Sequence, residues 1–178
     1  KLNVSFPRST GNTPCFYNHF VTDREEPFDQ PGTPEEPKGH YIFDKPEPLW
    51  NFGHGKSYTT FDYVDCALSD TLLAASDTLK VSVMIKNTGR CDGKEVVQLY
   101  VRDKVSTVAT PIQQLKAFQK VLVKSGESQC VELSLPIAEL ALYNAKMEEV
   151  VEPGDFEIQI GAASDDIRFK KTITINRK

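Results

Sequence analysis

The 178-residue chain carries 21 basic and 25 acidic residues, which gives a formal net charge of -4 and an isoelectric point near 5.4. It has no dense run of Lys or Arg of the kind that binds a nucleic-acid backbone, and no apolar run approaches the ~18 residues that cross a bilayer. We therefore expect neither nucleic acid as a partner nor insertion into a membrane. The length fits one domain of about 100 to 200 residues with a short appendage.

The first part of the chain differs in composition from the rest. Residues 1–60 hold 8 of the 11 prolines and 10 of the 17 aromatic residues. Because proline lacks a backbone donor, we expect this leader to be irregular rather than part of a sheet interior. Its aromatic residues are too numerous for a solvated linker, so we expect them to pack against another surface.

Two glycines, Gly53 and Gly55, stand on either side of His54 in the leader. With Phe52 and Tyr58 nearby, they predict a sharp backbone turn that lets both aromatic side chains face inward. A phosphate-binding loop is the alternative, but no strand-to-helix context accompanies these glycines. The turn is instead typical of a chain that passes from one domain to another.

Residues 63–178 show the apolar and polar alternation of β-strands. One such strand covers 79–86, and after turn residues at 87–93 a second covers 95–103, which together favour a hairpin. The expected inward residues are Leu79, Val81, Val83 and Ile85, then Val97, Leu99 and Val101, which alternate with Gln98, Tyr100 and Arg102.

The remaining segments continue this pattern to the end of the chain. A third strand runs over 115–124, with a bulge because Phe118 falls out of phase with its neighbours. A turn at 124–127 leads into a strand over 129–135, and Pro136 opens one helical turn. After a turn at 152–155, two further strands begin at 156 and 167.

About seven short strands separated by turns predict an all-β fold, a Greek-key β-sandwich of the immunoglobulin or fibronectin type III class. We expect two parts: a leader over 1–62 and the sandwich over 63–178. The faces of the sandwich should need no residue from the leader.

The four cysteines stand at wide and unequal spacings with no CxxC pair, which argues against a zinc knuckle or a disulfide scaffold. We expect free thiols, and a single bridge such as Cys66–Cys130 is the alternative. The three histidines show no metal-ligand spacing. We expect no metal and no other cofactor.

Specific motifs then point to a known family. Residues 48–61, PLWNFGHGKSYTTF, resemble a signature of glycoside hydrolase family 3, the β-glucosidase and β-xylosidase family. Residues 96–103, 115–118, 151–154 and 160–164 resemble its fibronectin type III-like C-terminal domain, and 103–107 is similar to its Asp-x-x-Ser-Ser pattern. Residues 1–9 and 17–19 resemble the last strand of the preceding α/β sandwich domain.

This resemblance implies a parent enzyme that hydrolyses β-linked glycosides with retention, using two carboxylates ~5 Å apart. In the family both carboxylates belong to upstream barrel and α/β domains, and an exported parent fits the family's habits. We therefore expect no catalytic residue here, no activity of the chain alone, and contact with a β-glycoside only through the parent. The expected docking residues toward those domains are Trp50, Phe52, Gly53, Gly55, Tyr58 and Phe61.

A carbohydrate-binding or adhesive immunoglobulin-like module is the alternative function, because such a fold alone does not decide what it binds. A sugar platform needs exposed, coplanar aromatic rings. Most aromatic residues of the predicted sandwich fall at core or edge positions, which disfavours this alternative.

Overall fold

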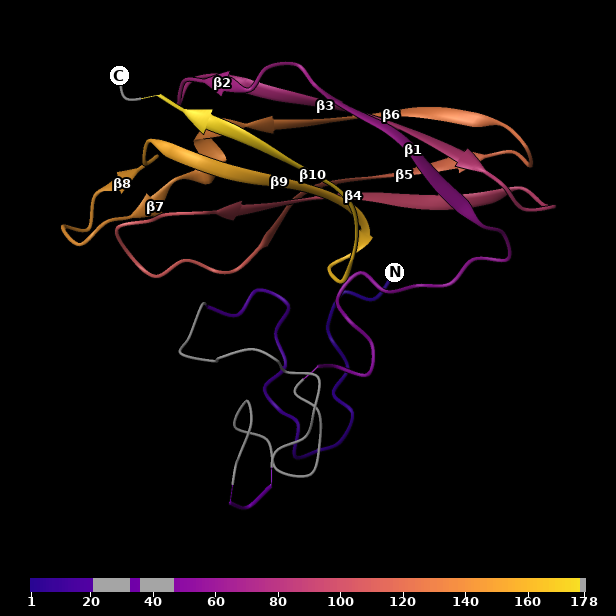
Figure 1. The fold of residues 1–178 in the computed structure, drawn as a ribbon, viewed down its shortest axis with the longest axis horizontal. Helices are drawn as coiled ribbons and strands as arrows, with labels where there is room; N and C mark the ends of the chain where they lie inside the picture. The colour runs from indigo at the N-terminus through magenta and orange to yellow at the C-terminus, as the bar shows by residue number, and fades with distance from the viewer. Residues whose placement is uncertain (21–32, 36–46, 177–178) are drawn as a thin grey trace.

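The computed structural model describes residues 1–20, 33–35 and 47–176, and these form a β-sandwich with the leader along one side (Figure 1). Within this part of the chain, the predicted all-β sandwich is confirmed. Its seven long strands are β1 (Phe61–Leu68), β3 (Thr78–Asn87), β4 (Gly93–Asp103), β5 (Gln114–Val123), β6 (Ser128–Pro136), β9 (Gly154–Ala163) and β10 (Asp166–Ile175). The shorter elements are β2 (Leu72–Leu73), the 3-10 helix η1 (Ile137–Leu140), β7 (Leu142–Tyr143) and β8 (Glu149–Val150).

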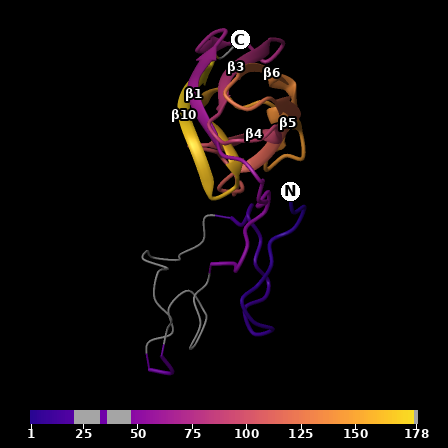
Figure 2. The same cartoon turned by 90° about the vertical axis from the view of Figure 1, so that its right-hand side faces the viewer.

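Two main sheets make the layers of the sandwich. The first has the order β1-β3-β6, and the second has the order β2-β10-β9-β4-β5. Neighbouring strands are antiparallel except for β2, which pairs parallel to the end of β10. Strands β7 and β8 form a separate ribbon. The two sheets face each other when seen from the side (Figure 2), and none of the described helices is long and apolar enough to cross a membrane.

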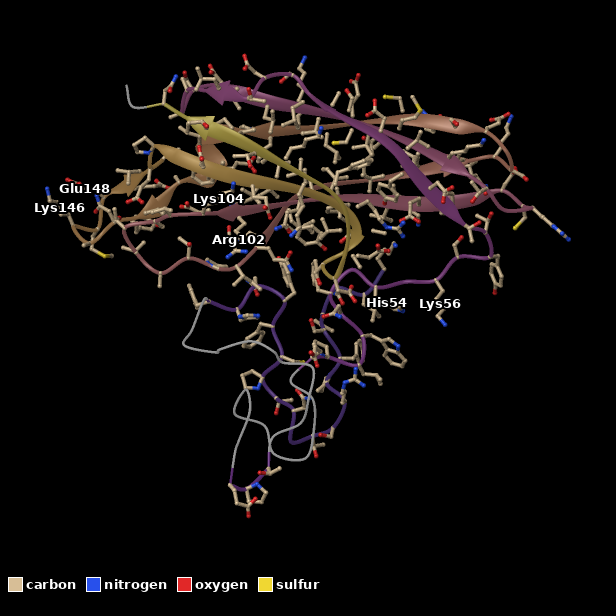
Figure 3. All side chains as sticks on the ribbon, viewed as in Figure 1. His54, Lys56, Arg102, Lys104, Lys146 and Glu148 are labelled. Carbon is tan, nitrogen blue, oxygen red and sulfur yellow. The ribbon has the colours of Figure 1, made fainter. Side chains whose placement is uncertain are left out.

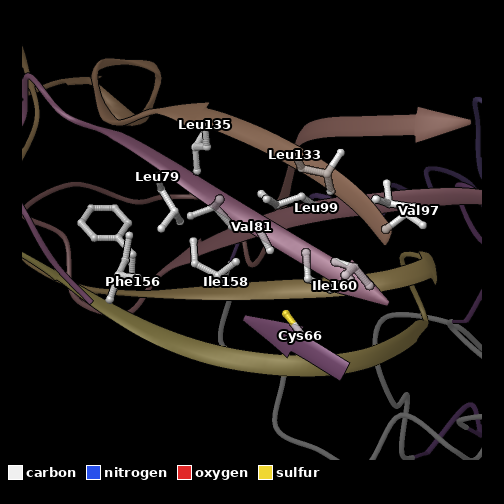
Figure 4. Packing of buried hydrophobic residues seen from close by; sticks show 14 of the residues in the cluster. Cys66, Leu79, Val81, Val97, Leu99, Leu133, Leu135, Phe156, Ile158 and Ile160 are labelled. Atoms are coloured by element: carbon white, nitrogen blue, oxygen red, sulfur yellow. The ribbon is translucent and has the colours of Figure 1, made fainter. Parts of the chain in front are cut away.

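The core fills the space between the sheets with aliphatic side chains, as the alternation predicts. Leu79 and Val81 of β3 point toward Leu99 of β4 and Ile158 of β9 (Figure 4), and all four are fully buried. The polar residues between them on β3 lie on the outer side of the sheet. The predicted inward faces of these strands are therefore confirmed.

The predicted hairpin between β3 and β4 is wrong. Strand β3 pairs with β1 and β6, whereas β4 pairs with β5 and β9, so the segment between β3 and β4 crosses from one sheet to the other. The buried Asn87 holds this crossing, because its Nδ2 donates to the carbonyls of Cys91 and Val123, each at 2.9 Å. Turn residues predict a change of direction, but they do not say which sheet the next strand joins.

The predicted bulge in the third strand is confirmed, two residues before the expected position. Leu99 pairs with Ala117 and Tyr100 pairs with Leu115, so Lys116 is the extra residue of β5. Phe118 is 65% exposed on the outer side. The single helical turn after Pro136 is confirmed as η1, and the turn before β6 contains Gly126 with φ of 77°.

All four cysteines are free, so the alternative bridge is absent. Cys66 lies in the core, whereas Cys130 is exposed on β6. The two side chains therefore lie on opposite sides of the first sheet.

Candidate functional site

Backbone hydrogen bonds join two described segments of the leader, residues 1–20 and 47–60, which we call its first and second arms. Leu2 donates to the carbonyl of His54 at 2.8 Å, and Gly53 donates back to Leu2 at 2.8 Å. Phe6 donates to the carbonyl of Trp50 at 2.8 Å. No regular strand forms among residues 1–20, 33–35 and 47–60, which agrees with the irregular structure predicted there, whereas most of the proline-rich stretch from 27 to 48 lies outside the described residues. These bonds fix residues 1–6 beside residues 49–54.

Tyr17 and Phe52 attach the leader to the outer face of the second sheet. Their rings stack with centroids 4.1 Å apart, and the Tyr17 ring meets the edge of Tyr100 at 5.9 Å. The Tyr17 hydroxyl accepts a hydrogen bond from the backbone N–H of Leu115 at 3.2 Å. The Ser164 N–H donates to the carbonyl of Phe52 at 3.0 Å. Phe52 therefore faces inward, as the sequence predicts.

Beneath these rings, the outward-pointing Gln98 and Tyr100 of β4 are buried. The Tyr100 hydroxyl donates to Oε1 of Gln98 at 2.6 Å, while Nε2 of Gln98 donates to the carbonyls of Ala162 and Gly53. Burial raises the pKa of Tyr100, so its hydroxyl stays protonated and remains a donor. The expectation that the sandwich faces need nothing from the leader is therefore wrong at this place.

Gly53 takes the sharp turn that the sequence predicts. Its φ is 80°, and a Cβ there would overlap the Gln98 side chain and lie 3.1 Å from the Cα of Ala163. Only glycine combines this backbone conformation with so close an approach. Gly55 has no positive φ, but a Cβ on it would lie 3.0 Å from Cδ of Lys1. It permits the two arms to approach each other.

The other predicted docking residues divide between the solvent and the core. Trp50 is 46% exposed and meets the ring of Phe6 edge-on at 5.9 Å. Tyr58 is fully exposed, so its predicted inward orientation is wrong: its carbonyl accepts a hydrogen bond from Sγ of Cys91, and the ring points away from the sandwich. Phe61 begins β1 and packs against the core.

The leader also presents further apolar side chains to the solvent. The segment with His54 and Lys56 runs below the sandwich, on the same side as the rest of the leader (Figure 3). The large apolar side chains of the described leader residues that are exposed to solvent belong to Val4, Phe6, Phe16, Phe20, Leu49, Trp50 and Tyr58. We call this set the outer leader surface.

A second feature joins two motifs that lie far apart in the sequence. Glu152 accepts hydrogen bonds from the Ser106 hydroxyl at 3.3 Å and from the N–H of Thr107 at 2.9 Å, and it also accepts one from the Thr107 hydroxyl. These bonds lower the pKa of Glu152 below its usual range. We call this arrangement the Glu152 clamp.

We predict that the clamp makes stability fall on acidification. A carboxylate whose pKa is lower in the folded than in the unfolded chain stabilises the fold above its unfolded pKa, and this contribution is lost as the pH falls through the folded value. Urea unfolding between neutral pH and the acid range should therefore show a steeper loss for the wild type than for Glu152→Gln. Glu132→Gln, on the exposed side of β6, is the control and should keep the wild-type slope.

We also predict that Tyr100→Phe lowers the free energy of unfolding by about 1–3 kcal/mol, because it leaves the buried Oε1 of Gln98 without its donor. Urea denaturation measures this loss. Tyr143→Phe, at an exposed ring on β7, should change stability by less than about 0.5 kcal/mol. Equal effects of the two substitutions would contradict a buried role for the Tyr100 hydroxyl.

Sequence reasoning missed Gln98 and Tyr100 as the residues that receive the leader. The only available signal was that Gln98 and Tyr100 share a strand face, and this does not reveal that another segment covers them. Among the described residues, no group of three His, Cys, Asp or Glu side chains could hold a metal ion.

Comparisons with known proteins fit this geometry. Residues 95–164 match the model of the fibronectin type III-like domain. A β-xylosidase of Formosa agariphila is 40% identical over 180 residues, covering 100% of this chain and 23% of that protein. A periplasmic β-glucosidase of Salmonella typhimurium is 36% identical over 171 residues, covering 94% of this chain and 22% of its own length.

Among solved structures, a β-glucosidase from Listeria innocua in complex with glucose superimposes with a TM-score of 0.84 at 34% identity. The superimposed region covers 98% of this chain and 24% of the Listeria innocua chain. The chain corresponds to the C-terminal, fibronectin type III-like part of glycoside hydrolase family 3. It spans less than a quarter of the length of the family 3 relatives described above, and it matches the part that carries the sandwich.

Proposed function

We propose that this chain is the non-catalytic docking module of a longer enzyme that hydrolyses β-linked glycosides with retention. In this proposal residues 1–62 connect the module to the barrel and α/β domains of the parent, and residues 63–178 form the supporting sandwich. The substrate meets those domains rather than this chain.

The proposal rests on the leader, because its inner side packs against the sandwich and its outer side is exposed to solvent. Phe52 and Gly53 hold the inner side against β4 and the end of β9, whereas the outer leader surface leaves Trp50 and Tyr58 in solvent. Apolar side chains that gather in one exposed patch mark interaction surfaces, and the proposal places these leader residues in such a patch. The β-xylosidase and β-glucosidase relatives are about four times as long as the region they share with this chain, which supports catalytic domains as the occupant.

Gly55 and Phe61 take supporting roles in the proposal. Gly55 lets residues 1–6 approach the second arm, and Phe61 starts the first strand against the core. The leader is thereby fixed at both sides of the aromatic segment. The sandwich then holds the outer leader surface in one orientation for docking.

Activity measurements test the proposal. The isolated chain should release no sugar from an aryl β-glucoside, because glycoside cleavage needs a positioned carboxylate pair and the nucleophile motif is absent from the sequence. In the longer enzyme, Trp50→Ala should accelerate thermal inactivation before it changes substrate preference, whereas Val64→Ala on β1 should not. Turnover by the isolated chain that depends on one of its own carboxylates would overturn the proposal.

Titration of the chain with soluble β-glucans separates the docking module from a carbohydrate-binding module. We expect no saturable binding, because Tyr17 and Phe52 use their ring faces on each other and on β4. Saturable binding lost in Trp50→Ala or Tyr58→Ala would favour the carbohydrate-binding alternative.

A further inference from the structure

We propose that the β4–β5 loop, residues 104–113, is a second docking contact for the same upstream domains, with Val105 as its apolar anchor. This inference rests on the proposed function, because it takes its occupant from there. It extends the docking surface from the leader onto the sandwich itself.

The loop is long and has no strand or helix of its own, but many hydrogen bonds hold it. Lys104 donates through its N–H to the carbonyl of Asp155 at 3.2 Å and through Nζ to the Thr172 hydroxyl at 2.9 Å. Asp103 accepts from the N–H of Val105 at 3.2 Å. The Glu152 clamp binds the next two residues of the loop. The backbone on both sides of Val105 is therefore fixed.

The side chain of Val105 packs against little of the sandwich, since it is 81% exposed. A rigid loop that presents an apolar side chain to solvent has already lost the conformational entropy that a flexible loop would lose on binding. A few well-packed, desolvated side chains provide most of the binding energy of a protein interface. The clamp and the exposed valine together fit a pre-organised docking contact.

The position of the loop identifies the occupant. Its far end joins the leader, because Ile112 donates to the carbonyl of His19 at 2.9 Å and Pro111 forms a β-bridge with Phe20. The loop leaves β4 near Arg102 and Lys104 and runs along the side of the sandwich that bears the leader (Figures 1 and 3). An upstream domain that covers the outer leader surface from this side would contact the loop as well. The relatives contain more than three quarters of their length outside the shared region.

A photo-cross-linking experiment on the longer protein tests this inference. The photoreactive residue benzoylphenylalanine is placed at position 105, at position 50 on the outer leader surface, or at position 64. Val64 is the matched control, because it is also an exposed valine, 57% accessible, but lies on β1 of the opposite sheet. We expect cross-links from positions 105 and 50 to segments that precede this chain, and none from position 64.

A second measurement uses the charged variants Val105→Asp and Val64→Asp of the longer protein. If Val105 is buried against an upstream domain, a charge at this position is unfavourable there. Val105→Asp should therefore shorten the half-life of thermal inactivation roughly fivefold relative to Val64→Asp. The inference requires both the cross-links from position 105 and the faster inactivation of Val105→Asp. If position 105 behaves like position 64 while position 50 still cross-links, the loop contact is wrong and the docking module stands; if position 50 also fails, the proposed function fails with it.

Discussion

Gly53→Ala should lower the free energy of unfolding by about 3–5 kcal/mol. A side chain at a φ of 80° costs about 1–2 kcal/mol in backbone strain. The new Cβ would also overlap Gln98 and force it away from Tyr100, which leaves buried polar atoms without partners at about 1–3 kcal/mol each. Urea denaturation followed by tyrosine and tryptophan fluorescence measures the loss.

Gly126→Ala is the matched control for this substitution. Gly126 has nearly the same φ, 77°, but no atom lies within 4 Å of its missing Cβ. It should show the backbone strain alone, about 1–2 kcal/mol. The difference between the two variants therefore measures the contact between the leader and β4. If both substitutions had the same effect, the close approach of Gly53 to Gln98 would not contribute to stability.

Leu99→Ala should destabilise the sandwich by about 2–5 kcal/mol, the usual effect of emptying a buried leucine site. Leu99 is fully buried and pairs with Ala117 on one side and Ile160 on the other, on an interior strand of the second sheet. The neighbouring strands are fixed by their own ladders, so they cannot collapse far into the cavity.

Lys80→Ala controls for a change on the polar side of a strand. Lys80 is exposed on β3 between the buried Leu79 and Val81, and it should contribute less than about 0.5 kcal/mol. Chemical denaturation of the two variants compares an inward and an outward position directly. Similar losses would mean that the inward face of these strands is misassigned.

The strands and their inward faces could be predicted from the sequence because they depend on local alternation. Val97 and Leu99 are two residues apart, and a strand with one buried face places both in the core wherever it lies in the sheet. The pairing of strands depends on distant segments instead. Nothing near Asn87 indicates that the chain changes sheets there, which is why the expected hairpin between β3 and β4 was wrong.

The candidate site was only partly predictable for a similar reason. Gly53 and Phe52 belong to a local motif, and the sequence predicted the turn and the inward ring. Tyr58 belongs to the same motif, but its orientation depends on the space left by β1 and the β3–β4 crossing. The receiving residues Gln98 and Tyr100 could not be found, because their burial arises from a segment about 45 residues earlier in the chain.

The backbone bond between Phe6 and Trp50 has a consequence for how this region can vary among proteins. The segment between these residues leaves and returns at points held within hydrogen-bonding distance of each other. Because Tyr17 and His19 contact the sandwich, residues can be added or removed without displacing it only between Phe20 and Leu49. Each doubling of such a closed segment adds only about 0.6 kcal/mol of closure entropy. We expect insertions and deletions among relatives to concentrate there, while the spacing from Trp50 to Phe61 stays constant.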